Sequence, residues 1–405
     1  MKKTFLFLLG ALAVCSCSKS VPVDQPVKAD DQAIGFSAFT HRATNTKGTI
    51  DDLASIEAAG RQYVMRAFQM ATVFPDAGST ARQYFSADFG FGINTSYPDT
   101  WNTASTYYWP KETVTDGNGA VAINALSFFT YGPSDADITF DANGYSGEVE
   151  RLYPCLDVTV ADENAEQQDI LAAMTEFRTY TVPGAAMGAE ANKVNIDYNH
   201  ILSAVTFLAN TKDSVVFRVR EIKVGLNPLD TANITAALYP SGRYGFEADN
   251  ERGLWSGISG DLKTYGVGLA GTDGYVVVDS TDNSADVRIN ADDQILMLIP
   301  QPIEEEKAYF SVTYDVYDKD NVNPLDTAIT KYAPLFATNL HEWATGKKYN
   351  YIFTLRKDVR YPIEYIVQVE GWEEQDVIEQ FEGQYTSDRD LPHYEDGGDE
   401  FDREW

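Results

Sequence analysis

Hydrophobic and polar residues alternate with a period of two along many short segments of this chain, and turn residues separate these segments. Examples are ALSFFTYG, KVNIDYNH, SVVFRVRE and KYNYIFTL. A period of two places successive side chains on opposite faces of a strand. Many short strands with turns between them predict an all-β fold of sandwiches or barrels, and 405 residues suffice for two such units.

Helical patterns are few. The segment TIDDLASIEAAG has Thr49 as a candidate N-cap and Gly60 as a stop, which predicts one short helix. The segment ADENAEQQDILAAMTEF predicts a helical turn. Helices are therefore expected to be minor elements of the fold.

The N-terminal segment MKKTFLFLLGALAVCSC has two lysines followed by an apolar run, as in a secretory signal peptide. The run is shorter than the ~20 residues that span a bilayer. Its end resembles a bacterial lipobox, which makes Cys17 the predicted lipidated residue; a plain signal peptide is the alternative. We therefore predict a lipoprotein signal peptide over residues 1–17 and a Pro-rich tether over 18–33.

The chain has three cysteines, and lipidation at Cys17 with loss of Cys15 leaves Cys155 without a partner. Cys155 lies in the apolar segment LYPCLDVTV. It is therefore expected to be a small buried residue rather than half of a disulfide.

Two strand-rich halves flank the segment VPGAAMGAEANK, which has no strand period. This places an N-terminal β-sandwich domain at residues 34–190 and a C-terminal one at 191–380. Residues 381–405 are acidic and lack alternation, so a disordered tail is predicted there.

Charge and missing motifs limit the function. The formal net charge is −30, which argues against nucleic acid and anionic membrane surfaces as partners. The four histidines are scattered, and no nucleophile elbow, phosphate-binding loop or EF-hand pattern is present. We therefore expect no enzymatic activity, no cofactor and no metal site.

A cluster of aromatic residues offers one alternative. Trp101, Tyr108 and Trp109 could stack on sugars if they were exposed, and Trp255 is a further candidate. Such a protein would be a surface glycan-binding lipoprotein of a nutrient-uptake system. However, Tyr107 and Trp109 fall on one face of an extended segment, which favours burial.

Five segments, in order, resemble those of the fimbrillin family, the type V pilins and Mfa-like fimbrial lipoproteins. They are IGFSAFTHRAT; STYYWPKE with LSFFTYGP; VNIDYNHILSAVTF; ILMLIPQP; and EWATGKKYNYIFTL with VQVEGW. Together they extend from Ile34 to Trp372. The resemblance implies two tandem transthyretin-like β-sandwich domains.

The resemblance also implies a function. The protein would be a structural and adhesive pilus subunit, exported as an outer-membrane lipoprotein with a palmitate-type anchor and displayed in a fimbrium at the cell surface. An arginine-specific protease would cleave between Arg42 and Ala43, removing a first strand that contains Phe36, Ala38 and Phe39. A strand of another fimbrial subunit would then fill the groove. Host or bacterial surface ligands are the implied adhesion partners.

The acidic tail does not look like a strand that could insert into a neighbour, apart from the segment DVIEQFEG. The sequence therefore leaves open whether this is a stalk, tip or anchor subunit. An anchor subunit would keep both its lipid and its first strand.

Overall fold

The structure is a computed structural model that describes residues 33–40, 53–70, 82–110, 125–142, 153–180, 192–228, 234–247, 253–280, 286–358, 360, 362–371 and 377–383. Strands dominate these residues, which confirms the all-β prediction. The helical elements among them are α1, Leu53–Ala59, and the 3-10 turn η3, Asn164–Glu166. Gly60 ends α1 with φ +62°, as the sequence predicts. No helix in the described ranges is long and apolar enough to cross a membrane.

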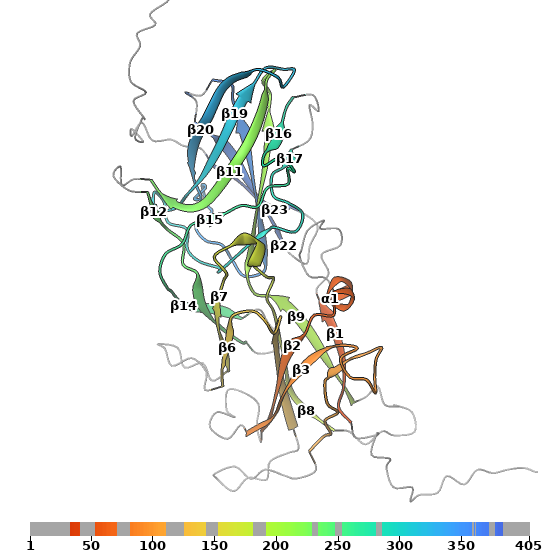
Figure 1. Ribbon diagram of the computed structural model, residues 1–405. Helices are drawn as coiled ribbons and strands as arrows, with labels where there is room; N and C mark the ends of the chain where they lie inside the picture. The colour runs from red at the N-terminus through yellow and green to blue at the C-terminus, as the bar shows by residue number, and fades with distance from the viewer. Residues whose placement is uncertain are drawn as a thin grey trace, which may run out of the picture.

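A seven-stranded sheet occupies the lower half of Figure 1, with strand order β1-β9-β8-β5-β2-β3-β4. Its strands are β1 Gly35–Thr40, β9 Lys193–His200, β8 Leu171–Thr179, β5 Ala125–Gly132, β2 Tyr63–Met70, β3 Arg82–Phe91 and β4 Trp101–Thr103. Neighbouring strands are antiparallel, except that β1 runs parallel to β9. Strand β1 thus forms one edge of this sheet.

One face of the seven-stranded sheet buries an aromatic cluster, which we call the N-terminal core. It includes Phe36, Tyr63, Phe85, Phe89, Trp101, Trp109, Phe128 and Tyr198. The ring of Phe36 on edge strand β1 lies 5.2 Å from that of Phe89 on β3, although four strands separate β1 and β3 in the sheet. The sheet therefore curls around this core.

The opposite face packs against a four-stranded sheet of order β14-β13-β7-β6. Its strands are β14 Leu254–Ser259, β13 Ser241–Gly245, β7 Cys155–Thr159 and β6 Ile138–Asp141. The middle core between the two sheets includes Phe129, Leu156, Val158, Tyr244 and Phe246.

Two six-stranded sheets form the upper half of Figure 1 and enclose the C-terminal core. The first contains β17 Val287–Arg288, β10 Ser203–Thr211, β21 Lys347–Leu355, β22 Glu364–Gly371 and β23 Val377–Gly383, with β18 Leu296–Leu298 also paired to β10. The second contains β12 Thr235–Ala236, β11 Val216–Asn227, β19 Tyr309–Tyr317 and β20 Pro324–Pro334, with β15 Tyr265–Gly266 and β16 Val276–Val278 also paired to β11.

The chain passes from the N-terminal sheet to the C-terminal sheets between β9 and β10, at the buried pair Ile201 and Leu202. Strand β9 pairs with β1 and β8, and β13 pairs with β7. Both β9 and β13 lie beyond residue 190, so the change of sheet does not coincide with the predicted boundary. The division into two tandem domains stays a prediction.

Candidate functional site

Strand β1 lies at the edge of the seven-stranded sheet, and its neighbour in the sheet is strand β9. The register runs from Gly35 opposite Lys193 to Thr40 opposite Tyr198. The β9 side chains on the core side are Val194, Ile196 and Tyr198, and all three are fully buried. Burial raises the pKa of the Tyr198 phenol, and its hydroxyl lies 2.9 Å from Thr130 Oγ1. The core-facing side of β9, next to β1, is therefore apolar and uncharged.

Alternate side chains of the first strand point into the N-terminal core. Ile34, Phe36 and Ala38 are buried, whereas Phe39 is 51% exposed. The ring of Phe36 makes edge-to-face contacts with Phe89 and Phe128, at centroid distances of 5.2 and 5.7 Å. Aromatic pairs of this geometry add to the stabilisation from buried area. Phe36 and Phe39 therefore lie on opposite faces of the strand.

A short clamp holds the N-terminal end of β1 on its other side. The Ile34 amide donates to the Tyr107 carbonyl at 2.8 Å, and Ala33 forms an antiparallel bridge with Tyr108. Among the described residues, no strand other than β9 pairs with Gly35–Thr40. The strand is thus bonded from both sides at its start and from one side along most of its length.

The free energy that keeps β1 bound to the rest of the sheet is modest. Burial of Ile34, Phe36 and Ala38 contributes about 4–7 kcal/mol at the usual value per buried apolar side chain. Covalent connection to the rest of the chain adds to this by keeping the local concentration of the strand high. Without that connection, only the burial free energy keeps β1 in place, and a competing strand with similar apolar side chains could supply the same amount.

Three predicted site residues, Cys17, Arg42 and Ala43, lie outside the described residues. The three residues assigned to a removable strand lie in β1, two facing the core and one facing outward. The structure therefore brings Phe36, Ala38 and Phe39 together on one edge strand.

The aromatic residues considered for sugar binding do not form an exposed platform. Trp101 and Trp109 are each only 4% exposed, whereas Tyr108 is 40% exposed. Trp101 Nε1 donates to Glu57 Oε1 of α1 at 2.7 Å, and the Trp109 ring contacts Phe128 in the core. Both tryptophans are therefore core residues, because their rings gain more from packing under the curled sheet than a solvated face would allow. The assignment of Trp101 and Trp109 as sugar contacts is corrected accordingly.

Trp255 is also unavailable as an open platform. It packs against the middle core, and its Nε1 donates to the Ile201 carbonyl at 2.8 Å. Tyr107 stacks on Phe85 with the ring centroids 4.0 Å apart, so the prediction that Tyr107 and Trp109 share an inward face is confirmed.

Other polar groups considered as chemistry have structural partners. His200 Nδ1 lies 2.8 Å from Asp169 Oδ2, and both side chains are buried where β8 and β9 meet. Cys155 is a fully buried residue of the four-stranded sheet and forms no disulfide, as predicted. Within the described ranges, no group of three or more His, Cys, Asp or Glu side chains could hold a metal ion.

Sequence reasoning missed the partners of β1. Its parallel neighbour β9 lies more than 150 residues away in the chain, and nothing in the sequence around Tyr107 and Tyr108 indicated that their backbone bonds to residues 33 and 34. The alternation in KVNIDYNH indicated that β9 has a buried face, but nothing local specified which strand it would accept.

The described fold defines a class: a chain of packed β-sandwich sheets in which β1 is an edge strand, with no metal-binding cluster in the described part. Comparison with known families is more specific. The model of the fimbrillin-like family matches residues 24–372, and the chain belongs to this family. It is therefore a fimbrial, cell-adhesion type of protein, and this family acts at the cell surface.

The chain was also compared with solved structures, and a match with a TM-score above 0.5 shows the same fold at low sequence identity. A fimbrial protein from Bacteroides vulgatus matches with a TM-score of 0.58 at 15% identity, over 84% of this chain and 99% of that one. The tip fimbrial protein Mfa3 from Porphyromonas gingivalis, truncated at its C-terminus, matches with a TM-score of 0.37 at 8% identity, over 77% of this chain and 94% of that one. No curated protein matches the chain.

Proposed function

We propose that this protein is a structural and adhesive fimbrial subunit that polymerises by strand exchange after its first strand is removed. The observation that carries the proposal is the position of β1. It is an edge strand whose inward side chains complete an aromatic core, while β9 alone pairs with it along Gly35–Thr40 among the described residues. Loss of such a strand leaves an apolar groove with an unpaired edge, which another strand can fill.

The groove sets a requirement for the strand that replaces β1. Apolar side chains are needed at alternate positions, to refill the places of Ile34, Phe36 and Ala38. The place of Phe36, between Phe89 and Phe128, is the largest and favours an aromatic or long aliphatic side chain. The partner in this assembly is another fimbrial subunit, either a second copy or a different chain.

Export and maturation complete the proposal. Lipidation at Cys17 would anchor the chain to the outer membrane, and an arginine-specific protease would cut between Arg42 and Ala43, just after β1. Cleavage there separates β1 from α1, whose Ile56 is buried in the N-terminal core. The helix would therefore remain in place when the strand leaves.

The decisive experiment compares the wild type with Arg42→Lys after treatment with an arginine-specific protease. The wild type should shorten to a form that begins at Ala43 and then form oligomers, whereas Arg42→Lys should stay full-length and monomeric. Arg61→Lys, next to strand β2, is the matched control and should behave as the wild type does. Equal polymerisation of Arg42→Lys would contradict strand removal and favour an anchor subunit that keeps β1.

Lipidation has its own test. Cells that express Cys17→Ala and are fed a palmitate analogue should show no label on this protein, whereas wild-type cells should. Undiminished label on Cys17→Ala would refute this assignment.

A further inference from the structure

The segment between β7 and β8 bonds to parts of the chain that lie more than 100 residues away. It contains the turn η3, the short olive turn that Figure 1 shows near the middle of the molecule, between its lower and upper halves. The segment begins at the four-stranded sheet and ends at β8 of the seven-stranded sheet. We call residues 161–168 the strap, because their side chains reach β18 of the C-terminal sheets.

Strand β18 has one edge that no described strand covers. It pairs with β10 on one side, and in the described part of the chain no strand pairs with its other side. Residues 295–298 alternate between two cores, since Leu296 and Leu298 lie in the C-terminal core whereas Ile295 and Met297 lie in the middle core. Strand β18 is therefore part of the wall between these two cores.

Two amide side chains of the strap bond to the uncovered edge of β18. Gln167 Oε1 accepts from the Met297 amide at 2.9 Å, and Asn164 Nδ2 donates to the Ile295 carbonyl at 3.1 Å. These two backbone groups belong to residues two apart, and in a strand such residues direct their N–H and C=O groups to the same edge. The side chains of Asn164 and Gln167 thus take the place of a neighbouring strand.

Both amide side chains are held by further hydrogen bonds. Asn164 is buried, and its Oδ1 accepts from the Gly268 amide at 3.0 Å, so this side chain joins two separate C-terminal segments. Gln167 Nε2 donates to the Ala161 carbonyl at 3.1 Å, which orients the Gln167 amide from within the strap. Removal of either side chain would leave a backbone group of the C-terminal sheets without its partner, which is costly for a buried group.

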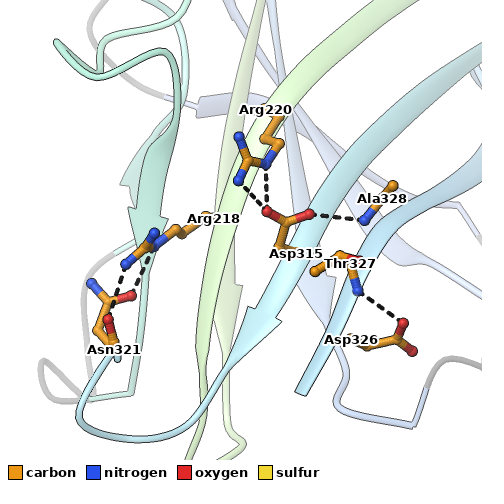
Figure 2. Close-up of polar contacts among 7 residues, drawn as sticks. All are labelled: Arg218, Arg220, Asp315, Asn321, Asp326, Thr327 and Ala328. Carbon is orange, nitrogen blue, oxygen red and sulfur yellow. Dashed lines mark hydrogen bonds and ion pairs between the residues drawn. The ribbon is translucent and has the colours of Figure 1, made fainter. Parts of the chain in front are cut away.

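Side chains also bond backbone groups in the β19–β20 hairpin, but there the bonds stay within one sheet. The Asp315 carboxylate of β19 accepts from the Ala328 amide of β20 at 2.8 Å, and Arg218 of β11 donates to the Asn321 carbonyl at 2.9 Å (Figure 2). Strands β11, β19 and β20 belong to the same sheet, so these bonds shape that sheet alone. The strap differs because its bonds connect the segment that leads into β8 to a different sheet.

We propose that Asn164 and Gln167 are positioning residues that keep the seven-stranded sheet folded when β1 is weakened or absent. The strap leads directly into β8, and the Ile170 carbonyl before β8 accepts from the Ile201 amide at 3.0 Å. Loss of β1 removes buried apolar contacts from the seven-stranded sheet, whereas the strap ties β8 of that sheet to the C-terminal sheets, which do not contain β1. The C-terminal sheets then support the opened sheet until another strand arrives; this last step rests on the proposed function.

The test weakens β1 in the full chain with Phe36→Ala, so that no protease is needed, and follows hydrogen exchange by NMR. Phe36→Ala alone should accelerate exchange in β1 and leave the amides of β5, in the same sheet, at their wild-type rates. Gln167→Leu is similar in size but removes the acceptor of the Met297 amide. Added to Phe36→Ala, it should accelerate exchange in β5 by about tenfold, the effect of losing one hydrogen bond to a buried group.

Gln168→Leu is the matched control, because it is the same substitution at the next residue of the strap. Gln168 Nε2 donates to Asp135 Oδ2 at 3.3 Å, in the loop between β5 and β6, and not to the C-terminal sheets. Added to Phe36→Ala, Gln168→Leu should leave exchange in β5 unchanged. Gln167→Leu without Phe36→Ala should accelerate exchange of the Met297 amide but not of β5, since β1 is then in place.

Asn164→Ala removes the other two bonds and, added to Phe36→Ala, should act as Gln167→Leu does. The proposal is overturned if β5 keeps the exchange rates of Phe36→Ala alone in both combinations, or if Gln168→Leu accelerates β5 as strongly. A combination that fails to fold supports the strap if Phe36→Ala with Gln168→Leu does fold, and overturns it if that control fails too.

Acceleration of β5 in Phe36→Ala alone would show that the strap does not hold the sheet, and would also count against a removable β1. Failure of the strap by itself leaves exchange local in every variant, so the two failures are distinguishable. The cleavage experiment with Arg42→Lys tests the proposed function independently of the strap.

Discussion

Strands β1 and β10 show how position in a sheet, rather than composition, decides whether a strand can leave. Each has one parallel neighbour, β9 beside β1 and β21 beside β10, and all other described strand pairs are antiparallel. Each also inserts a phenylalanine into an aromatic cluster. Phe36 contacts Phe89 and Phe128, while Phe207 contacts Phe310 and Tyr351.

The two strands differ in what lies on their other side. Strand β10 is also paired with β18 and β17, so it has bonded neighbours on both edges. Its alternate residues face two clusters, because Ala204 lies in the middle core and Val205 in the C-terminal core. Strand β1 has β9 on one side and a two-residue clamp on the other. We therefore expect an apolar strand to be removable only where the sheet ends beside it.

The largest effect is expected from Phe207→Ala. Phe207 is fully buried in a strand that is bonded on both sides, so the cavity cannot be relieved by local detachment. The substitution should lower the free energy of unfolding by about 3–5 kcal/mol. Urea denaturation measures this loss, and amides of β10, β19 and β21 should all exchange faster together. Exchange that is faster in β10 alone would contradict the difference drawn between the strands.

A smaller and more local effect is expected from Phe36→Ala. The substitution should weaken the hold on β1 by about 2–3 kcal/mol, and the strand should detach while the rest of the sheet stays folded. Hydrogen exchange should accelerate by one to two orders of magnitude over Phe36–Thr40. Amides of β5 and β10 should keep their wild-type rates. Acceleration throughout the seven-stranded sheet would mean that β1 is an integral strand and not a removable one.

A cut in the chain tests how far the two halves are joined. Residues 180–192 connect β8 to β9, and both strands belong to the same sheet. A specific protease site placed there should therefore give two fragments that stay together on gel filtration and separate only under denaturing conditions. If the fragments separate without denaturant, the predicted division at residue 190 describes two independent domains.

The sequence predicted most strands because their alternation is strong, and it missed those whose environment breaks the pattern. Strand β20 reads PLDTAITKYAP, with prolines at both ends and polar residues on an exposed edge, so it looks like a turn. Strand β13 contains Gly242, whose missing side chain leaves room for the ring of Trp255 about 3 Å from the position of a Cβ. A glycine inside a strand weakens the alternation of hydrophobic and polar residues, and only the structure shows that a neighbouring side chain requires it.

The candidate site shows the same limit. The first strand and the inward direction of Phe36 could be predicted from local alternation. Its neighbours could not, because the pairing of β1 with β9 joins distant segments and depends on the curl of the sheet. For the tryptophans near residue 105, the sequence favoured burial over an exposed platform, and Trp101 and Trp109 are core residues; their partners in the N-terminal core could not be predicted from the segment alone.

The smallest predicted effect is a pH dependence confined to the turn between β19 and β20. Hydrogen bonds from the Val322 amide and then from the Asn323 side chain lower the pKa of Asp318 below its ordinary value. Because the folded-state pKa is depressed, the stabilisation from this carboxylate is present above the unfolded pKa of about 3.9 and is lost as the pH falls through the folded value. Protection of the Val322 amide should therefore be constant from neutral pH to about pH 4 and fall only below it. Asp318→Ala should remove that protection at every pH, while the difference in exchange between β1 and β10 persists, since neither strand is held by a charged group at this turn. Loss of the β1–β10 difference in Asp318→Ala would show that the two strands are coupled through the C-terminal hairpin.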